Sequence, residues 1–249
     1  MTTTAVGIDI GGTGIKGAIV DVATGELLTD RMKLPTPEGG KPDDILDTVL
    51  ALFDEIGDIG ADAHVGVCFP AIVLGGRTMS AANVSKKWIG LEAEALFEQK
   101  LGRDIHFVND ADAAGIAEAR YGAAVGAKGL TILTTLGTGI GSAMLFNGEL
   151  IPNSELGHLQ LEGQDAEHLA STSAKEKEDL SWKQWAKRLQ RYYSHLEALL
   201  WPDLFVVGGG VSKDAEKFLP LLDLKTPIVA AKLENRAGII GAAHLAAHK

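Results

Sequence analysis

The sequence predicts an α/β protein that contains the same glycine-closed β-hairpin twice. The first hairpin is closed by Asp9–Lys16, which reads D-I-G-G-T-G-I-K and lies between two apolar runs. The second is closed by Gly137–Gly141, which reads G-T-G-I-G and follows the apolar run Leu130–Leu136. Between and after the hairpins, apolar residues recur at the spacing of amphipathic helices. Repeated hairpins among such helices predict a mixed α/β fold with an ancient duplication of a β-rich half.

Each element is predicted from the spacing of its apolar residues and from the turn residues that bound it. Strands are expected at 6–10, 15–22, 27–34, 64–69, 105–108, 130–136, 142–146, 203–207 and 228–230. Helices are expected at 43–56, 90–101, 112–121, 181–200 and 236–247. The prolines and glycines of 35–42 predict a loop, and 163–179 is a polar segment.

The first glycine loop has three competing interpretations: a dinucleotide-binding loop, a purely structural hairpin and a phosphate-binding loop between two strands. Gly12, Gly14 and Gly17 fit G-x-G-x-x-G, but the dinucleotide interpretation of that pattern requires a helix after the loop. The segment Ile15–Val22 is rich in β-branched residues, so it predicts a strand instead. A purely structural hairpin leaves the lysine and the aspartate of the loop unexplained. Because glycine lets the backbone approach an anion, and because N–H groups, a hydroxyl and an ammonium suit a phosphate, the sequence indicates a phosphate-binding loop.

Composition argues against several classes of function. The 249 residues carry a net charge of −10, which disfavours a nucleic-acid surface as the general mode of binding. No apolar run of roughly 18 residues and no charged-then-apolar leader is present, so neither a membrane span nor a signal peptide is expected. The single cysteine, Cys68, excludes an internal disulfide and fits a reducing cytoplasm. It lies in the apolar run V-G-V-C-F-P, as expected of a buried core thiol.

A third glycine element, Gly208–Gly210, follows a short predicted strand. Two phosphate hairpins and a later glycine turn that opens a helix resemble the actin/hexokinase-like (ribonuclease H-like) superfamily. Within that superfamily the chain resembles the ROK group of sugar kinases. The resemblance implies two α/β lobes, a small one at 1–109 completed by a C-terminal helix at 235–249, and a large one at 110–234.

The resemblance also implies which residues of a kinase site bind the phosphoryl donor. It implies Mg²⁺ positioned by Asp9 through water, and charge neutralisation by Lys16. The residues whose backbones would hold the transferring phosphate are Gly11, Gly12, Thr13, Gly14, Gly137, Thr138 and Gly139. The residues expected beside the adenosine of ATP are Gly208, Gly209 and Gly210.

A polar cluster, Asn109–Asp112, ends the strand expected at 105–108. Carboxylates at the carboxyl end of a sheet strand face the ligand crevice of an α/β fold. Alternatively, Asp110 or Asp112 would cap the helix that follows, and capping is the preferred interpretation for Asp112. The resemblance implies that Asp110 is the catalytic base, which accepts the proton of the attacking hydroxyl, and that Asn109 binds the sugar.

The tetrapeptide Glu155–His158, E-L-G-H, matches the family's E-x-G-H sugar-binding motif. A lone histidine is usually structural, but the order of the motifs favours hydroxyl recognition by Glu155 and His158. The family then carries a C-x-C-x-x-x-x-C zinc element, whereas residues 159–168 contain no cysteine, so no structural zinc is expected. Glu167 matches an acid that follows the zinc element and touches the sugar.

One further segment resembles the sugar site of the family. Phe69–Ala71 is similar to its G-x-P-G, with alanine in place of the last glycine, and a neighbouring loop carries Asn83 and Trp88. The resemblance implies that Asn83 binds the sugar. Trp88 stays open between a sugar contact and plain packing.

The helix expected at 181–200 has an uninterrupted basic side in an acidic protein. A solvated face is the default interpretation, but a polyanion would bind along such a side with salt-sensitive affinity. The expected apolar stripe is Trp185, Leu189, Tyr192, Leu196 and Leu199. The polyphosphate track would be Lys183, Lys187, Arg188 and Arg191, extended by Lys86 and Lys87. The chain is also shorter than most ATP-using ROK kinases. This shortness, the missing zinc element and the loop L-P-T-P-E-G-G-K-P resemble the polyphosphate-using glucokinases and glucomannokinases of the family.

These resemblances imply a phosphotransferase that moves a phosphoryl group from inorganic polyphosphate, and also ATP, to the 6-hydroxyl of glucose or mannose. The alternative is a strictly ATP-dependent glucokinase or another hexose kinase. A ROK repressor would carry a DNA-binding domain before a core that here begins by Val6. The pair Asn109-Asp110 with Glu155 and His158 argues against a sugar-binding or acetate-kinase-like protein. A cytoplasmic homodimer without nucleic-acid or membrane partners is expected.

Overall fold

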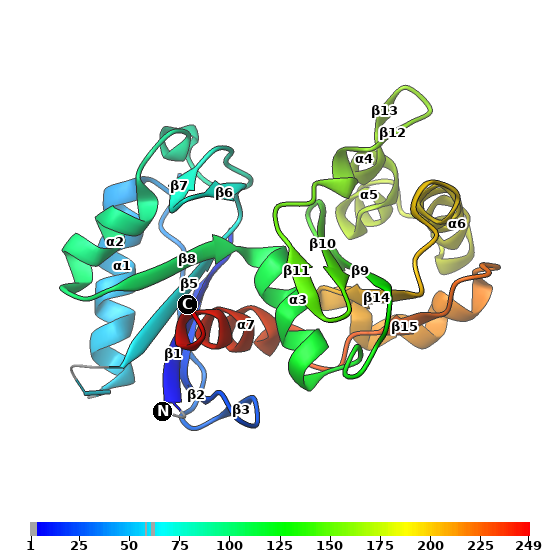
Figure 1. The fold of residues 1–249 in the computed structure, drawn as a ribbon. Coiled ribbons are helices and arrows are strands. Elements are labelled where there is room, and N and C mark those ends of the chain that lie inside the picture. The colour runs from blue at the N-terminus through cyan, green and yellow to red at the C-terminus, as the bar shows by residue number, and fades with distance from the viewer. Residues whose placement is uncertain (1–3, 58, 61–62) are drawn as a thin grey trace. The chain divides into compact units, whose positions relative to one another are not determined.

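The computed structural model describes residues 4–57, 59–60 and 63–249. The backbone divides into two compact units: unit 1 is Met1–Ala117 with Arg236–Lys249, and unit 2 is Glu118–Asn235. Each unit has its own sheet with helices packed against it (Figure 1). Across the described residues, no helix is long and apolar enough to cross a bilayer.

The sheet of unit 1 has the strand order β3-β2-β1-β5-β8, with β4 paired to β2. Its strands are β1 (Thr4–Ile10), β2 (Ile15–Asp21), β3 (Glu26–Leu27), β4 (Met32–Leu34), β5 (His64–Phe69) and β8 (Ile105–Asn109). β1 and β2 are antiparallel, whereas β5 and β8 continue the sheet parallel to β1. A strand therefore follows the first loop, as the sequence predicted, and the dinucleotide interpretation is excluded.

Helices cover both faces of this sheet (Figure 1). The helices are α1 (Pro42–Ile56), α2 (Ala93–Leu101), α3 (Asp110–Tyr121) and α7 (Ala237–Ala247), with a small hairpin of β6 (Val73–Leu74) and β7 (Arg77–Thr78) and the 3₁₀ turn η1 (Lys86–Trp88). α7 packs directly onto the strands. A Cβ placed on Gly7 would lie 1.9 Å from the carbonyl oxygen of Ile239, and one on Gly66 would lie 1.9 Å from that of Ala242. Glycine on β1 and β5 is therefore what lets the C-terminal helix dock.

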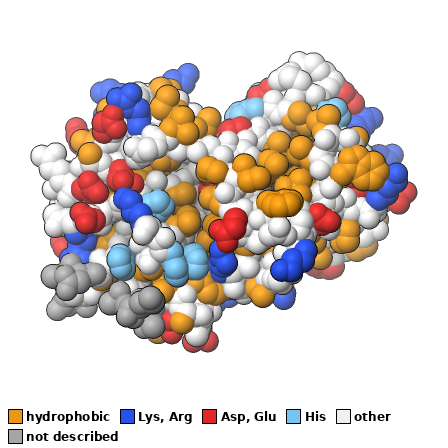
Figure 2. All heavy atoms as spheres, in the orientation of Figure 1, with side chains coloured by type: hydrophobic (Ala, Val, Ile, Leu, Met, Phe, Trp, Pro, Cys, Tyr) orange, Lys and Arg blue, Asp and Glu red, His pale blue; other side chains and the backbone are white. Residues whose placement is uncertain are grey.

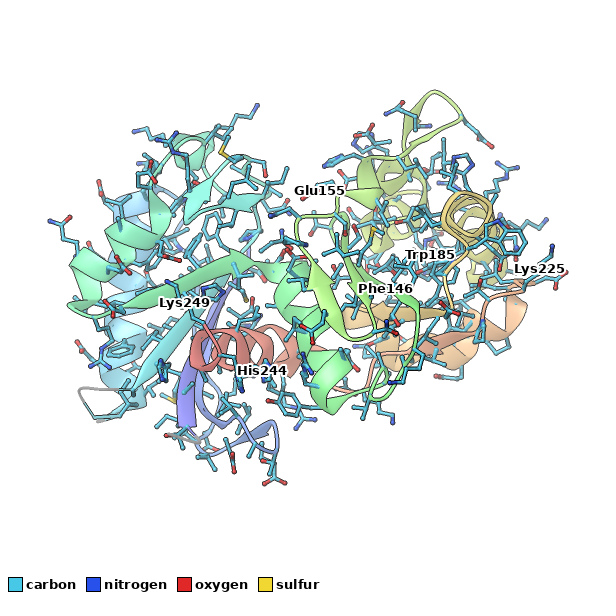
Figure 3. The ribbon with its side chains drawn as sticks, viewed as in Figure 1. Phe146, Glu155, Trp185, Lys225, His244 and Lys249 are labelled. Carbon is cyan, nitrogen blue, oxygen red and sulfur yellow. The ribbon has the colours of Figure 1, made fainter. Side chains whose placement is uncertain are left out.

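The sheet of unit 2 has the order β11-β10-β9-β14-β15. Its strands are β9 (Leu130–Leu136), β10 (Ile140–Phe146), β11 (Glu149–Ile151), β14 (Leu204–Gly208) and β15 (Ile228–Ala230). The remaining elements are η2 (Leu156–His158), the hairpin β12 (Gln160–Leu161) and β13 (Gln164–Asp165), α4 (Ala166–Ala170), α5 (Thr172–Lys177), α6 (Trp182–Leu200) and the 3₁₀ helices η3 (Gly210–Lys217), η4 (Leu219–Leu221) and η5 (Glu234–Arg236). α6 is held by a capping box at Ser181 and Gln184, and it buries Trp185 in the core of unit 2 (Figure 3).

Three expectations are corrected. The strand expected at 27–34 is two short strands, because the N–H of Ile19 donates to the hydroxyl of Thr29 at 3.1 Å and the backbone ladder is interrupted there. The polar segment 163–179 contains α4 and α5, which are too short to show a helical repeat in the sequence. Leu199 is 57% exposed and lies outside the apolar stripe, while Leu200 packs against the core.

One edge of unit 2 is apolar. β11 is an edge strand, and hydrophobic side chains gather over β10 and β11 in Figure 2. Phe146 is 55% exposed and Ile151 46% exposed. Exposed apolar strand edges favour association with another chain.

Candidate functional site

Three strands of unit 1 end side by side where the first loop begins. β1, β5 and β8 are parallel neighbours, with Asp9 opposite Cys68 and Phe69 opposite Asn109. The first loop follows β1 at the sheet edge where β8 ends at Asn109 and Asp110 follows. The carboxyl ends of neighbouring parallel strands are the usual ligand edge of an α/β sheet. The structure therefore brings together the first loop and the predicted base.

Asp9 and Lys16 form an ion pair beside this loop. Nζ of Lys16 donates to Oδ2 of Asp9 at 2.9 Å, and the two residues lie directly opposite each other on β2 and β1. Sγ of Cys68 lies 3.7 Å from Oδ1 of Asp9. Burial, followed by the nearby carboxylates of Asp9 and Asp110, raises the pKa of the Cys68 thiol well above its ordinary value. Cys68 is thus a neutral, buried core thiol, as predicted.

The first loop is closed by its own backbone and by a neighbouring hydroxyl. The N–H of Gly11 donates to the carbonyl of Gly14 at 3.1 Å, and the hydroxyl of Thr36 donates to the carbonyl of Gly11. Gly12 and Thr13, at the tip of the loop, are exposed. The loop is therefore fixed at its base while its tip is open to a ligand.

Asn109 caps α3. Its Oδ1 accepts the N–H groups of Ala111 at 2.8 Å and of Asp112 at 3.0 Å, and its Nδ2 donates to the carbonyl of Ala71 at 2.9 Å. Asn109 thus takes the capping role that the sequence analysis preferred for Asp112, because it precedes the helix and reaches both N–H groups. Asp110 lies in the first turn of α3, where the helix dipole favours a carboxylate, and its Oδ1 accepts the N–H of Ala111 at 2.9 Å. Asn109 therefore fixes the backbone that carries Asp110.

The loop that carries Asn83 lies against the tip of the first loop. A Cβ placed on Gly12 would lie 3.1 Å from Cβ of Asn83, which is exposed and has a φ of 60°. Trp88 is fully buried instead: its indole N–H donates to the carbonyl of Gly40 at 2.9 Å and its ring stacks on Phe97. Of the two interpretations left open for Trp88, packing is correct. Asn83 is brought to the first loop.

In unit 2, Glu167 holds the second loop. Its Oε2 accepts the N–H of Ile140 at 3.1 Å. A Cβ placed on Gly139 would lie 2.3 Å from the same oxygen, so a side chain there would have to displace the carboxylate end of Glu167. At the start of α5, the N–H of Ser173 donates to the carbonyl of Gly137 at 3.1 Å. The sequence analysis expected Glu167 only as a sugar ligand. It did not predict that this carboxylate also binds the backbone of the second loop.

Glu155, His158 and Glu167 belong to one electrostatic cluster of unit 2; Figure 3 labels Glu155. Nε2 of His158 lies 3.6 Å from Oε2 of Glu155, and its Nδ1 is hydrogen-bonded to Oδ2 of Asp165 at 2.9 Å. Burial raises the pKa of Glu155, with Glu167 raising it further and His158 opposing. The hydrogen bond to Asp165 is the main cause that raises the pKa of His158. A carboxyl and an imidazole so arranged offer both donors and acceptors to hydroxyl groups.

The sequence analysis missed Asp165. A turn at Glu162 and Gly163, both with positive φ, folds β12 and β13 into a hairpin that returns Asp165 to His158. The available signal was Gly163, a glycine in a polar stretch and hence a candidate turn residue.

The third glycine element lies next to the second loop. β14 is parallel to β9, with Gly208 opposite Thr135. Gly209 has a φ of 83°, and a Cβ placed on it would lie 2.4 Å from the carbonyl oxygen of Leu136. The glycine turn opens a helix as predicted, and that helix is the 3₁₀ helix η3. The carboxyl ends of β9 and β14 thus bring the second loop and Gly208–Gly210 to one edge of the sheet.

Two of the four cations on the basic side of α6 already have carboxylate partners from other segments. Within the part of the chain that the structure describes, Lys183 and Lys187 are exposed and form no ion pair. Arg188 pairs with Glu178, and Arg191 pairs with Glu162. The spacing of residues along the helix could not show these partners.

A model of the ROK family matches residues 5–171, and the chain belongs to this family. Its fold is the actin/hexokinase-like fold of ROK sugar kinases, as the sequence predicted. The chain is 48% identical over 238 residues to the polyphosphate glucokinase of Mycobacterium tuberculosis, covering 95% of this chain and 89% of that protein.

Two solved structures extend the comparison. The inorganic polyphosphate/ATP-glucomannokinase of Arthrobacter sp. strain KM matches with a TM-score of 0.96 and 50% identity, covering 99% of both chains. The ROK family glucokinase of Streptomyces griseus, solved with glucose and AMPPNP, matches with a TM-score of 0.82 and 24% identity, covering 99% of this chain and 100% of that one. The expected resemblance to polyphosphate-using ROK kinases is confirmed.

Proposed function

We propose that this protein phosphorylates the 6-hydroxyl of glucose with inorganic polyphosphate, and also with ATP, as the donor. The observation that carries the proposal is identity of about one half, over almost the whole chain, to a polyphosphate glucokinase and to a polyphosphate/ATP-glucomannokinase. The product is glucose 6-phosphate, together with a polyphosphate shortened by one phosphate or ADP.

Asp110 is proposed as the general base. It accepts the proton of the 6-hydroxyl while the sugar oxygen forms a bond to the terminal phosphorus and the bridging P–O bond of the donor breaks. Its position at the start of α3, beside the first loop in unit 1, supports this role. General-base assistance contributes typically ~10²–10⁴ in rate, and most of the remaining acceleration of such transfers comes from positioning and electrostatics.

The donor is proposed to be held by backbone N–H groups and fixed charges. Lys16 neutralises charge near the first loop. The phosphate-binding residues are Gly11, Gly12, Thr13, Gly14, Gly137, Thr138 and Gly139, and those beside the adenosine of ATP are Gly208, Gly209 and Gly210. The adjacency of the second loop and the third glycine element in unit 2 supports this division.

The sugar is proposed to be bound by a set of polar side chains. Their amide, carboxyl and imidazole groups suit the several hydroxyls of a hexose. These residues are Asn83, Asn109, Asp110, Glu155, His158 and Glu167. Since glucose and mannose share most of their hydroxyls, we propose that mannose is also accepted.

Asp9 is proposed to position Mg²⁺ through water. It is a single carboxylate with one oxygen bonded to Lys16, and the described residues contain no cluster of three or more His, Cys, Asp or Glu side chains suited to a metal. This fits Mg²⁺, which keeps several waters and binds chiefly to substrate phosphates. When bound, the ion would neutralise charge on the transferring phosphoryl group.

The test is phosphorylation of glucose and of mannose with polyphosphate and with ATP, each at low and high salt. We expect activity with both donors and stronger salt inhibition with polyphosphate. Activity with ATP alone would favour the alternative, a strictly ATP-dependent ROK hexose kinase. Light scattering on the same preparation tests a homodimer, which the apolar β10–β11 edge supports.

A further inference from the structure

Three charged residues form one row across the strands next to the first loop. Asp9 on β1 is directly opposite Lys16 on β2, and Lys16 is directly opposite Lys33 on β4. Residues directly opposite each other in an antiparallel ladder project from the same face of the sheet. The row is therefore one acid and two cations on a single face, and Lys33 has no part in the function proposed above.

This row has one more positive charge than negative charges. Lys16 is paired with Asp9 at 2.9 Å, whereas Lys33 is exposed and forms no ion pair with any described residue. Two like charges directly opposite each other in a sheet are destabilising. A position that breaks such a rule without a compensating contact is typical of a functional site.

The stem of Lys33 lies on the first loop. A Cβ placed on Gly14 would lie 2.7 Å from Cε of Lys33 and 3.6 Å from its Cγ. Gly14 is not among the residues with positive φ, so its backbone conformation does not require glycine. The missing side chain instead leaves room for the lysine stem. Three residues later, Thr36 donates to the carbonyl of Gly11 and ties this segment to the loop.

We propose that Lys33 binds the phosphate chain of the donor at the first glycine loop, an inference that rests on the proposed function. The loop offers backbone N–H groups, which are neutral, and the charge of Lys16 is shared with Asp9. A phosphate chain carries about one negative charge per residue, so charge-assisted hydrogen bonds from a second cation strengthen its binding. Polyphosphate and the triphosphate of ATP both present this chemistry, and the two donors are separate arms of the test.

The test compares wild type with Lys33→Met, Lys33→Arg and a control, Lys128→Met. Methionine keeps the apolar stem and removes the charge, and arginine keeps the charge. Lys128 is exposed and precedes β9, at the opposite end of that strand from the second loop, so it controls for loss of one charge. KM and kcat are measured for polyphosphate and for ATP at saturating glucose, and KM for glucose at a saturating donor, at low and high salt.

We expect Lys33→Met to raise KM for polyphosphate about tenfold, the scale of one charge-assisted hydrogen bond, and to weaken its salt dependence. KM for glucose should stay unchanged, Lys33→Arg should restore KM for polyphosphate, and Lys128→Met should match wild type. A rise for polyphosphate alone assigns Lys33 to the longer chain, and a rise for both donors assigns it to the phosphates that they share.

An unchanged KM for both donors in Lys33→Met overturns the inference, as does an equal change in Lys128→Met. If wild type phosphorylates glucose with neither donor, it is the proposed function that fails. In that case, titration of the protein with inorganic polyphosphate alone still tests Lys33, because weaker binding to Lys33→Met than to Lys128→Met upholds the site, and equal binding refutes it.

Discussion

The two glycine loops share a strand–glycine–threonine–glycine–strand sequence, yet their surroundings differ in charge. The first loop lies beside cations, the ion-paired Lys16 and the exposed Lys33. The second lies against a carboxylate, because Glu167 accepts the N–H of Ile140 at its end. The same local sequence therefore does not imply the same chemistry. The first loop is equipped to attract an anion, whereas the second is held in shape by an acid.

The glycines of the two loops also serve different neighbours. At Gly14 a side chain would meet the flexible stem of Lys33, which can move away. At Gly139 it would meet the carboxylate of Glu167, which could move away only by giving up its hydrogen bond to the N–H of Ile140. The first loop should tolerate changes that the second does not.

The largest expected effect concerns the edge of unit 1 that carries the first loop. Asp110→Asn should lower kcat by ~10²–10⁴ because the base is lost. KM for glucose and the melting temperature should stay close to wild type, since asparagine can still accept the N–H of Ala111. Steady-state kinetics, isothermal titration with glucose and thermal melting provide the measurements. Turnover within a few-fold of wild type would remove Asp110 as the base.

The second loop is tested by a pair of substitutions two residues apart. Gly139→Ala should destabilise the protein by about 1–3 kcal/mol and reduce activity, because its Cβ would displace Glu167. Gly137→Ala should change the free energy of unfolding by less than about 0.5 kcal/mol, since nothing lies within 4 Å of its added Cβ. Urea unfolding of both variants measures the difference. Equal stabilities would show that Glu167 is not fixed as described.

The elements that bear these loops follow from the sequence, because alternation and glycine spacing are local properties. The same is true of Glu155 and His158, which lie in one short motif. The contacts that tune the site are not local. Asp165 reaches His158 only through the turn of a hairpin, and Asn109 caps α3 because β8 ends one residue before the helix. Periodicity reports which face of an element is buried, but it does not report which side chains meet across a turn.

The pairing of His158 with Asp165, both in unit 2, predicts that the stabilisation from this pair depends on pH. The pKa of His158 is raised above its ordinary value of 6.5, mainly by the hydrogen bond to Asp165. The stabilisation from this pair is therefore fully present below pH 6.5 and is lost as the pH rises through the raised, folded-state pKa. Asp165→Asn should return the pKa of His158 toward 6.5 and raise KM for glucose a few-fold, because the imidazole is less firmly oriented.

The measurement is an NMR titration of the His158 ring, together with KM for glucose across the same pH range. Asp214→Asn is the matched control, since Asp214 is also an aspartate of unit 2 that pairs with a nearby cation, Lys217. An unshifted His158 titration in Asp165→Asn would show that this hydrogen bond does not set its charge.

The smallest effect is expected from substitutions on α6. Its size shows whether the basic helix or the cations beside the first loop contribute more to polyphosphate binding. Lys183→Ala with Lys187→Ala should raise KM for polyphosphate by no more than about threefold, because exposed lysines contribute little each. Arg188→Ala should lower the melting temperature instead, since Arg188 pairs with Glu178 and donates to the carbonyl of Leu169 at 3.1 Å. KM for polyphosphate at two salt concentrations, measured beside Lys33→Met, ranks the two regions. A larger rise of KM for polyphosphate in the α6 double variant than in Lys33→Met would place the main polyanion contacts on the helix. The first loop would then not be the main cationic region.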